Sequence, residues 1–207
     1  MAVALLYSGG KDSTLAALLL DRFYDVTLVT GTFGITDDWR HARRAADRLG
    51  YPFRTLDLDP AVADDAVAQM RADGYPRNGI QTVHEHALER AAELDVRAVA
   101  DGTRRDDRVP TVDRPTAQSL EDRHDVSYLA PLAGFGRRAV DAMTDAALDV
   151  VTGPSETVSR ADYEAELREI LADRAGADTV ESVFPPHDQT HVRGVDPEWS
   201  GRPDTPK

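Results

Sequence analysis

Six consecutive residues, Ser8 to Ser13 with the sequence SGGKDS, combine the side chains and the flexible backbone that suit a phosphate group. Glycines let the main chain approach an anion closely, serine hydroxyls donate hydrogen bonds, and Lys11 adds a full positive charge. Lys11 is one of only two lysines, since 22 of the 24 basic residues are arginine. A compact ammonium needed in a tight phosphate turn explains why a lysine stands here. We call Ser8–Ser13 the glycine turn.

The glycine turn joins a hydrophobic run, typical of a buried strand, to a segment of helical spacing. A strand ending at Tyr7 and a helix opening at Asp12 direct backbone N–H groups and the positive helix end toward one point. The turn therefore predicts binding of a phosphate or pyrophosphate; the alternative is an ordinary strand–helix turn with convenient glycines. The common P-loop needs other residues at Leu5 and Asp12, and the dinucleotide fingerprint needs a third glycine.

The rest of the chain predicts the elements that position this turn. Short β-branched segments alternate with longer segments of helical spacing, which is typical of a parallel sheet built from strand–helix units. Strands are expected at Val3–Tyr7, Val26–Thr32, Phe53–Leu58, Val96–Ala100 and Val126–Ala130. Helices are expected at Asp12–Phe23, Asp37–Leu49, Ala61–Asp73, Gln81–Leu94 and Gly136–Val151. Turn residues between Gly74 and Gly79 indicate a helical hairpin before the fourth strand.

We expect one main domain over residues 1–154 and a C-terminal appendage over residues 155–207. A last helix is expected through ADYEAELREILADRAG, capped by Ser159 with Asp162 three residues on. The segment after it lacks periodicity, so we expect an irregular tail. His187, His191 and Arg193 in this tail suggest that it folds over the glycine turn as a lid or substrate contact. The spacing of the two histidines is weak evidence for zinc.

Composition limits the class of protein. The formal net charge is −13, with 27 Asp against 10 Glu, which suggests a salt-rich, halophilic cytoplasm and does not exclude nucleic acid as a partner. No cysteine is present, which excludes disulfides, thiolate metal sites, iron–sulfur clusters and cysteine nucleophiles. No leader and no long apolar stretch is evident, so we expect a soluble, cytoplasmic protein without a membrane partner.

These motifs carry a resemblance to a known family. The sequence SGGKDS matches the PP-loop signature S-G-G-x-D-S of the adenine nucleotide α-hydrolase-like superfamily, which includes ATP pyrophosphatases, NAD synthetase and tRNA-lysidine synthetase. Three further stretches follow in the family's order: VTGTFG at Val29–Gly34, ADGTRRDD at Ala100–Asp107, and APLAGFGRRAV at Ala130–Val140. The resemblance extends from about Val3 to Val151.

The resemblance implies an α/β fold of Rossmann-like HUP type, with a five-stranded parallel sheet of order 3-2-1-4-5 between helices. It also implies Mg²⁺ and ATP at the carboxyl ends of the strands. A carboxylate, amide or ureido oxygen would attack the α-phosphorus, giving an adenylated intermediate and pyrophosphate, and ammonia or an amine could then act as nucleophile. An archaeal group of single-domain members labelled asparagine synthase-like or α-hydrolase is the most similar, although the glutaminase half of asparagine synthetase is missing.

The same resemblance assigns roles to individual residues. The implied catalytic residues are Lys11, Ser13 and Arg104. The implied ATP contacts are Ser8, Gly9, Gly10, Lys11, Asp12, Ser13, Thr30, Phe33, Gly102 and Thr103. Asp12 and Asp107 would hold magnesium, with Asp101 and Asp106 as further carboxylates of the same loop. Apart from the resemblance, position in the predicted fold makes Arg105 and Arg137 candidate substrate contacts, and the tail adds His187, His191 and Arg193. In so acidic a chain, the alternative for each Asp or Arg is a solvated surface position.

Several functional alternatives remain open at this level. A tRNA-modifying member of the superfamily would have RNA as substrate, and Arg40, Arg43, Arg44 and Arg48 form a basic stripe that could bind it. Such a stripe is more often a solvated helix face. A nucleotide-binding regulatory module without catalysis is a further possibility, and an oligomer is possible. His84 and His86, two apart on a helix, face different directions and do not predict a shared metal.

Overall fold

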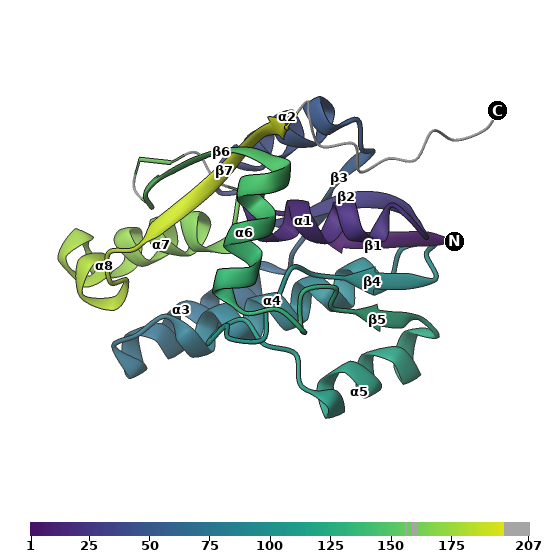
Figure 1. Cartoon of the computed structure of the whole chain (residues 1–207). Helices are drawn as coiled ribbons and strands as arrows, with labels where there is room; N and C mark the ends of the chain where they lie inside the picture. Colours follow the sequence, from purple (N-terminus) through teal and green to yellow (C-terminus); the bar gives the residue numbers. More distant parts are fainter. Residues whose placement is uncertain (156, 159–160, 197–207) are drawn as a thin grey trace.

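The computed structural model describes residues 1–155, 157–158 and 161–196. Its centre is a five-stranded parallel sheet in the order β3-β2-β1-β4-β5, which confirms the predicted fold (Figure 1). The strands are β1 (Ala2–Leu6), β2 (Asp25–Thr32), β3 (Phe53–Asp57), β4 (Ala98–Ala100) and β5 (Ser127–Leu129). The sheet is Rossmann-like, with helices on both of its faces.

Strand β1 occupies the middle of the sheet. Leu5 pairs with Leu28 of β2 on one side and with Ala100 of β4 on the other. Val3 and Leu5 pack into one hydrophobic cluster, and Ala4 and Leu6 into the other. A strand covered on both faces needs a continuous apolar run rather than alternation, and this explains the sequence AVALL.

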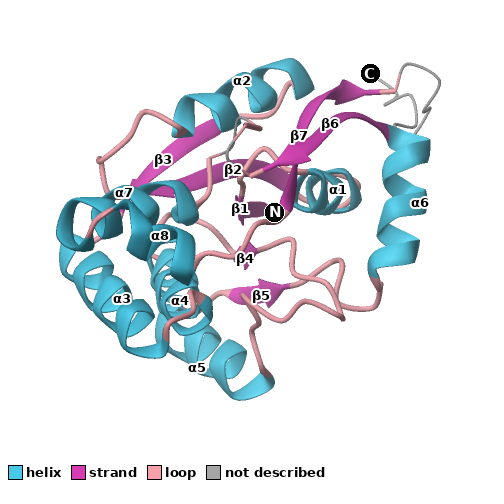
Figure 2. Cartoon of the chain, turned by 90° about the vertical axis from the view of Figure 1, so that its left-hand side faces the viewer, coloured by secondary structure: helices cyan, strands magenta, loops and turns pink. Residues whose placement is uncertain are grey.

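Two helical layers enclose the sheet (Figure 2). One cluster includes residues of α1 (Lys11–Leu20), α2 (Trp39–Leu49) and α6 (Arg137–Ala147). The opposite cluster includes residues of α3 (Pro60–Asp73), α4 (Arg77–Ala92), α5 (Arg114–His124), α7 (Tyr163–Ala175) and α8 (Ala177–Val183). Helices α3 and α4 form the expected hairpin. No helix among the described residues is long and apolar enough to cross a membrane.

The chain after α6 differs from the sequence prediction. Helix α6 ends at Ala147, because the β-branched stretch beyond it forms β6 (Leu148–Pro154). Strand β6 pairs antiparallel with β7 (Asp188–Val195), so part of the expected irregular tail is a strand. Helix α7 begins after Asp162, whose side chain accepts from the backbone N–H of Ala165 at 3.3 Å. The predicted cap Ser159 lies outside the described residues.

Candidate functional site

The glycine turn lies where the central strand β1 ends and α1 begins. Gly9 has φ of +80°, a left-handed conformation that glycine adopts without strain. Gly10 is the N-cap of α1 and makes no side-chain capping hydrogen bond. The hydroxyl of Ser13 donates to the carbonyl of Gly10 at 3.3 Å, and the N–H of Gly10 donates to Oγ of Ser8. The positive end of the helix favours an anion at this point, and two hydroxyl groups flank it.

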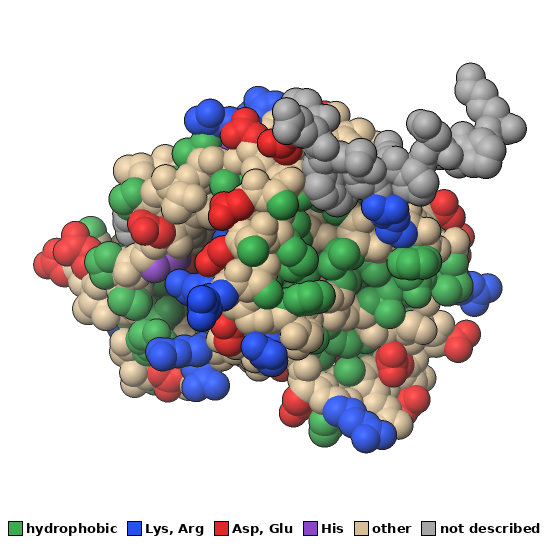
Figure 3. Space-filling view, viewed as in Figure 1, with side chains coloured by type: hydrophobic (Ala, Val, Ile, Leu, Met, Phe, Trp, Pro, Cys, Tyr) green, Lys and Arg blue, Asp and Glu red, His purple; other side chains and the backbone are tan. Residues whose placement is uncertain are grey.

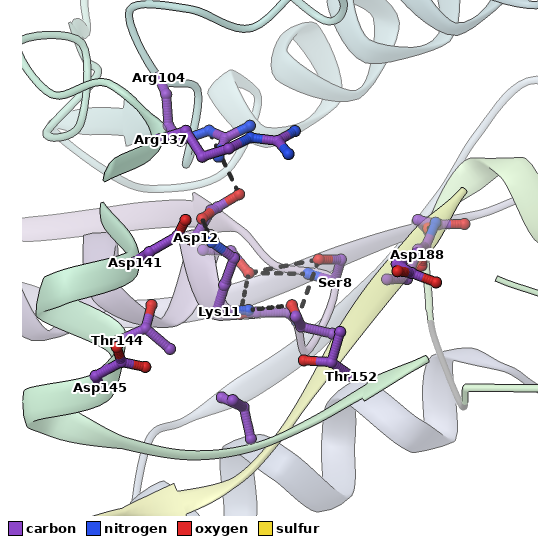
Figure 4. A pocket seen from close by; sticks show the side chains of 16 residues that line it. Ser8, Lys11, Asp12, Arg104, Arg137, Asp141, Thr144, Asp145, Thr152 and Asp188 are labelled. Atoms are coloured by element: carbon purple, nitrogen blue, oxygen red, sulfur yellow. Dashed lines mark hydrogen bonds and ion pairs between the residues drawn. The ribbon is translucent and has the colours of Figure 1, made fainter. Parts of the chain in front are cut away.

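Lys11 is held from two directions (Figure 4). Its Nζ donates to Oδ1 of Asp141 on α6 at 2.6 Å and lies 3.6 Å from Oδ1 of Asp12. The hydrogen bond from Lys11 is the main cause that lowers the pKa of Asp141 below its ordinary value. Without a ligand, the lysine charge is thus balanced by carboxylates of the protein itself.

Asp12 has the features of a magnesium ligand. Its Oδ1 is buried and accepts no hydrogen bond from the described residues. Burial raises the pKa of Asp12, and Asp107 adds to that, whereas Lys11 and Arg104 act in the opposite direction. A buried carboxylate oxygen without a donor suits a hard cation. No group of three or more potential metal ligands occurs in the described part of the chain, so nucleotide phosphates and water would have to complete the coordination shell.

The other carboxylates of the β4–α5 loop are engaged with the protein. Both oxygens of Asp107 accept hydrogen bonds from Arg104, one from its backbone N–H at 2.7 Å and one from Nε at 2.9 Å. Asp106 accepts from the N–H of Arg137 at 2.8 Å. These contacts indicate that Asp107 holds Arg104 in place. Arg104 in turn reaches to 3.7 Å from Oδ2 of Asp12.

Gly102 brings this loop against the glycine turn. A Cβ at Gly102 would lie 2.8 Å from the backbone nitrogen of Ser13 and 2.9 Å from its Cα. Both are backbone atoms that cannot swing away. The absence of a side chain at Gly102 therefore allows the loop after β4 to meet the start of α1.

Two cavities meet at the glycine turn. One has a volume of about 530 Å³ and contains Lys11, Arg104, Arg137 and Asp141 in its wall. The other has a volume of about 420 Å³ and lies between the ends of β1, β2 and β4 and the helices α4 and α7. Ser8, Asp12 and Ser13 line both. The first is a charged cavity and the second a nucleoside-sized cavity with apolar walls, and we use these two names below.

Strand β7 completes the glycine turn from the far end of the sequence. The N–H of Lys11 donates to Oγ1 of Thr190 at 3.1 Å, and the N–H of Val192 donates to the carbonyl of Gly9 at 2.9 Å. Helix α7 contributes a second link, since the buried carboxylate of Glu166 accepts from the N–H groups of Phe33 and Ile35. The C-terminal segment thus contacts both the glycine turn and the loop after β2.

The residues predicted from the sequence fall into three groups. Lining the charged cavity are Ser8, Gly10, Lys11, Asp12, Ser13, Arg104 and Arg137. Lining the nucleoside-sized cavity are Ser8, Asp12, Ser13, Thr30, Gly102, Thr103, Asp107 and His187. Lining neither of the two are Gly9, Phe33, Arg105, His191 and Arg193.

Comparison with known proteins places the chain in a family. A family model described as "Family of unknown function (DUF7411)" matches residues 1–194. The chain belongs to the DUF7411 family. A relative in Methanocaldococcus jannaschii, named uncharacterized protein MJ0690, is 38% identical over 196 residues, covering 94% of this chain and 96% of the relative.

One solved structure shares the fold of this DUF7411 member, and a second has a weaker similarity. A crystal structure described as a predicted subunit of tRNA methyltransferase from Methanocaldococcus jannaschii is 36% identical, with a TM-score of 0.86, and covers 95% of this chain and 98% of that one. The U34-tRNA thiolase NcsA from Methanococcus maripaludis, solved with its [4Fe-4S] cluster, is 17% identical with a TM-score of 0.44 over 70% of this chain and 56% of that one. None of these three is named an asparagine synthase, so that expected likeness stays a prediction.

One pair in the DUF7411 chain was not expected from the sequence. Nε2 of His84 lies 2.8 Å from Oδ2 of Asp101, and both side chains are buried. Oδ1 of Asp101 accepts from the N–H and the hydroxyl of Thr103, and Oδ2 also accepts from the hydroxyl of Tyr128. Asp101 therefore has no oxygen left for the metal role considered above. The helical spacing of His84 with Ala87, Leu88 and Ala91 indicates a buried face and could have revealed that His84 is buried, although not its partner.

Proposed function

We propose that this protein is a PP-loop enzyme that uses Mg-ATP to adenylate an oxygen atom of an RNA substrate, with release of pyrophosphate. The observation that carries the proposal is the meeting of three features at one point. These are the positive end of α1, the ammonium of Lys11 and the buried Oδ1 of Asp12, which accepts no hydrogen bond from the described residues. Together they provide positive charge, backbone donors and a cation ligand for a triphosphate.

The two cavities suit the two halves of ATP. The nucleoside-sized cavity combines apolar walls, such as Val29 and Ile80, with the polar ends of β2 and β4. It would take adenosine on its β2 side, and its other side, at His84 and the end of β4, would face the reacting group of the substrate. The charged cavity contains Lys11, Arg104 and Arg137 and would take the phosphates. Magnesium, held by Asp12 and the phosphates, would supply charge neutralisation.

The chemistry of the first step follows from these positions. A substrate oxygen attacks the α-phosphorus, the bond from that phosphorus to the oxygen bridging to the β-phosphorus breaks, and pyrophosphate leaves with the electron pair. Lys11, the N–H groups at the start of α1 and Arg104 stabilise the charge that develops on the leaving group. For this, the ion pair between Lys11 and Asp141 breaks, and Nζ of Lys11 binds a phosphate oxygen instead.

A basic surface beside the glycine turn supports RNA as the substrate. The arginine surface consists of Arg40, Arg43, Arg44 and Arg48 on α2 and Arg193 on β7, all exposed. Figure 3 shows basic side chains at the upper edge of the molecule, where Figure 1 places α2. On its buried side α2 approaches the turn, since a Cβ on Gly9 would lie 3.4 Å from Cα of Ala42.

The charge of the arginine surface and the similarity to a solved structure both favour a polyanion as its ligand. In a chain with net charge −13, these five exposed arginines lie on two neighbouring elements, and one of them, Arg40, is paired with Asp37 at 3.0 Å. The arginines lie close to His191, since the pKa of His191 is lowered first by burial and then by His41, Arg48, Arg44 and Arg193. The structure that shares 36% identity is described as a predicted subunit of tRNA methyltransferase, which also supports tRNA.

The anion site argues against a methyl transfer by this chain. A methyl donor such as S-adenosylmethionine carries no phosphate, so a methyl transfer would not use the phosphate-binding features of the glycine turn. A mere nucleotide-binding module is less well supported, because binding alone does not need the complete donor set of the glycine turn.

The test measures AMP and pyrophosphate separately from ADP and phosphate. The protein is incubated with Mg-ATP and total tRNA at several salt concentrations, with a tRNA-free metabolite extract as the second arm. We expect AMP and pyrophosphate only with tRNA. Products only with the extract would support a small-molecule ligase instead, and ADP, or binding without turnover, would reject the adenylation chemistry.

A further inference from the structure

The His84–Asp101 pair lies in the wall of the nucleoside-sized cavity, which also contains Ser8 and Asp12 of the glycine turn. Asp101 is the hydrogen-bond partner of the His84 ring within the described residues, through Nε2 at 2.8 Å. Nδ1 of His84 makes no hydrogen bond within the described residues, and it is not among the fully buried atoms that lack a partner, so it is accessible. Because His84 lines the cavity, we take Nδ1 to be open to it.

Asp101 fixes which ring nitrogen of His84 carries the proton. Burial acts to raise the pKa of Asp101, but the hydrogen bond and charge of His84 and the hydrogen bonds from Thr103 outweigh it and lower the pKa. An ionised carboxylate only accepts hydrogen bonds, so Nε2 of His84 must be the donor. In the neutral ring, the lone pair then lies on Nδ1, which faces the cavity.

The other titratable groups around this cavity are less suited to take up a proton. Tyr163 of α7 lies edge-on to His84, with ring centroids 6.1 Å apart, and burial raises its pKa. Burial also raises the pKa of Tyr7 to about 12. Both nitrogens of His187 are engaged, Nδ1 near the Pro185 carbonyl at 3.1 Å and Nε2 near Glu164 at 3.3 Å.

The carboxylates that line the cavity have other partners. Asp107 is bound to Arg104, and Asp162 accepts from the side chain of Gln189 and from the backbone of α7. Asp12 faces Lys11 and Arg104. The other titratable groups named here are paired with protein groups or carry a proton. His84 therefore differs from them in having a ring nitrogen that is open to the cavity.

We infer that His84 is a catalytic base and that Asp101 is its positioning residue, an inference that rests on the proposed function. A carboxylate substrate needs no base to attack ATP, whereas an amide or ureido group gains nucleophilicity when its N–H loses a proton. As the substrate oxygen bonds to the α-phosphorus and pyrophosphate leaves with its electron pair, the adjacent N–H proton passes to Nδ1 of His84. The substrate class is therefore an N–H-bearing amide or ureido group, as in the lactam of a nucleobase, rather than a carboxylate.

The experiment compares initial rates of pyrophosphate release, with Mg-ATP and total tRNA as the probe, in wild type, His84→Gln, Asp101→Asn and His86→Gln. Glutamine retains a donor to Asp101, so His84→Gln should fold normally. The control residue His86 lies on the same helix but accepts from the N–H of Asp59, outside the cavity. We expect His84→Gln to be slower by about 10²-fold or more, with unchanged ATP binding, and His86→Gln to match wild type.

The ring tautomer separates catalysis from structure. ¹⁵N NMR of the His84 ring should show the proton on Nε2 in wild type, and Asp101→Asn should reduce that preference. Equal rates for His84→Gln and His86→Gln, or a proton on Nδ1 in wild type, would overturn the inference. If wild type releases no pyrophosphate with tRNA, the proposed function fails, and the catalytic role of His84 fails with it even if the tautomer is as expected.

Discussion

Asp141 on α6 and Lys11 in the glycine turn form an ion pair with 2.6 Å between Oδ1 and Nζ. The two residues are 130 positions apart in sequence, yet the pair joins the wall of the charged cavity to the group that would bind phosphate. A phosphate that enters this site must compete for the Lys11 ammonium with the carboxylate of Asp141, which is already paired with it. Under the proposed function, Asp141 would therefore lower the affinity of Lys11 for ATP.

Replacement of Asp141 by Asn should strengthen ATP binding by about two- to fivefold, since a partly exposed ion pair is worth about 0.5–1 kcal/mol. Titration calorimetry with ATP measures the change. Asp145→Asn is the matched control, because Asp145 lines the same cavity one turn later but forms no ion pair with Lys11 in the described structure. Weaker ATP binding in Asp141→Asn would contradict the competition.

The same pair predicts a pH effect on stability. The pKa of Asp141 is lowered in the folded protein by the Lys11 hydrogen bond, so the pair stabilises the fold above the ordinary carboxyl range. This contribution is lost as the pH falls through the lowered pKa. The difference in free energy of unfolding between wild type and Asp141→Asn, from urea titrations, should be present at pH 7 and vanish in strong acid. A difference that grows on acidification would disprove this linkage.

Lys11→Ala and Lys11→Arg should both lose pyrophosphate release and retain normal folding by circular dichroism. Alanine removes the charge, and the larger planar guanidinium does not fit a turn in which Lys11 is already enclosed by Asp12 and Asp141. The readout is the rate of AMP and pyrophosphate formation. Full activity in Lys11→Arg would show that any cation suffices at this position.

Gly102→Ala should lower the free energy of unfolding by about 1–3 kcal/mol, because its Cβ would meet the backbone of Ser13 at 2.8 Å. It should also weaken ATP binding, since the start of α1 would have to shift. Gly134→Ala provides the control, as no atom lies within 4 Å of its Cβ position. Thermal unfolding compares the two, and equal effects would mean that the close approach at Gly102 is not required.

Charge reversal on the arginine surface should weaken tRNA binding without changing ATP binding. Arg48→Glu and Arg193→Glu should each reduce affinity and lower the salt dependence by about one unit in slope if each contacts a phosphate. Arg71→Glu on α3, on the opposite side of the sheet, serves as the control. Filter binding at several salt concentrations gives both quantities. An unchanged slope in the two surface variants would exclude this face as the RNA contact.

The sheet could be predicted from sequence because short strand-like segments, such as the apolar run AVALL of β1, alternate with segments of helical spacing. Helix α5 was missed because Leu120 is its only buried residue, so its sequence has no apolar stripe that would predict a helix. Its start did carry a signal in the Asp113 cap, which accepts from the N–H of Thr116. A helix without an apolar face is recognisable mainly from its cap.

Strands β6 and β7 were missed for a different reason. Val150 continues the helical spacing of Val140, Met143 and Ala147, so the local pattern extends the helix beyond its actual end. Only pairing with residues about forty positions later turns this stretch into a strand. The same holds for the candidate site. The glycine turn is a local motif and could be predicted from the sequence, whereas the His84–Asp101 pair joins a helix to a strand end and could be recognised only in the folded structure.

The hydrogen bonds from Lys11 to Thr190 and from Val192 to Gly9 join the first loop of the protein to the last strand that the structure describes. During synthesis, the glycine turn leaves the ribosome long before β7 exists. The turn can reach its final hydrogen bonding only after nearly the whole described chain has emerged. A nascent chain therefore carries the residues of the glycine turn before their partners exist, and the turn reaches its final hydrogen bonds only once β7 has been made.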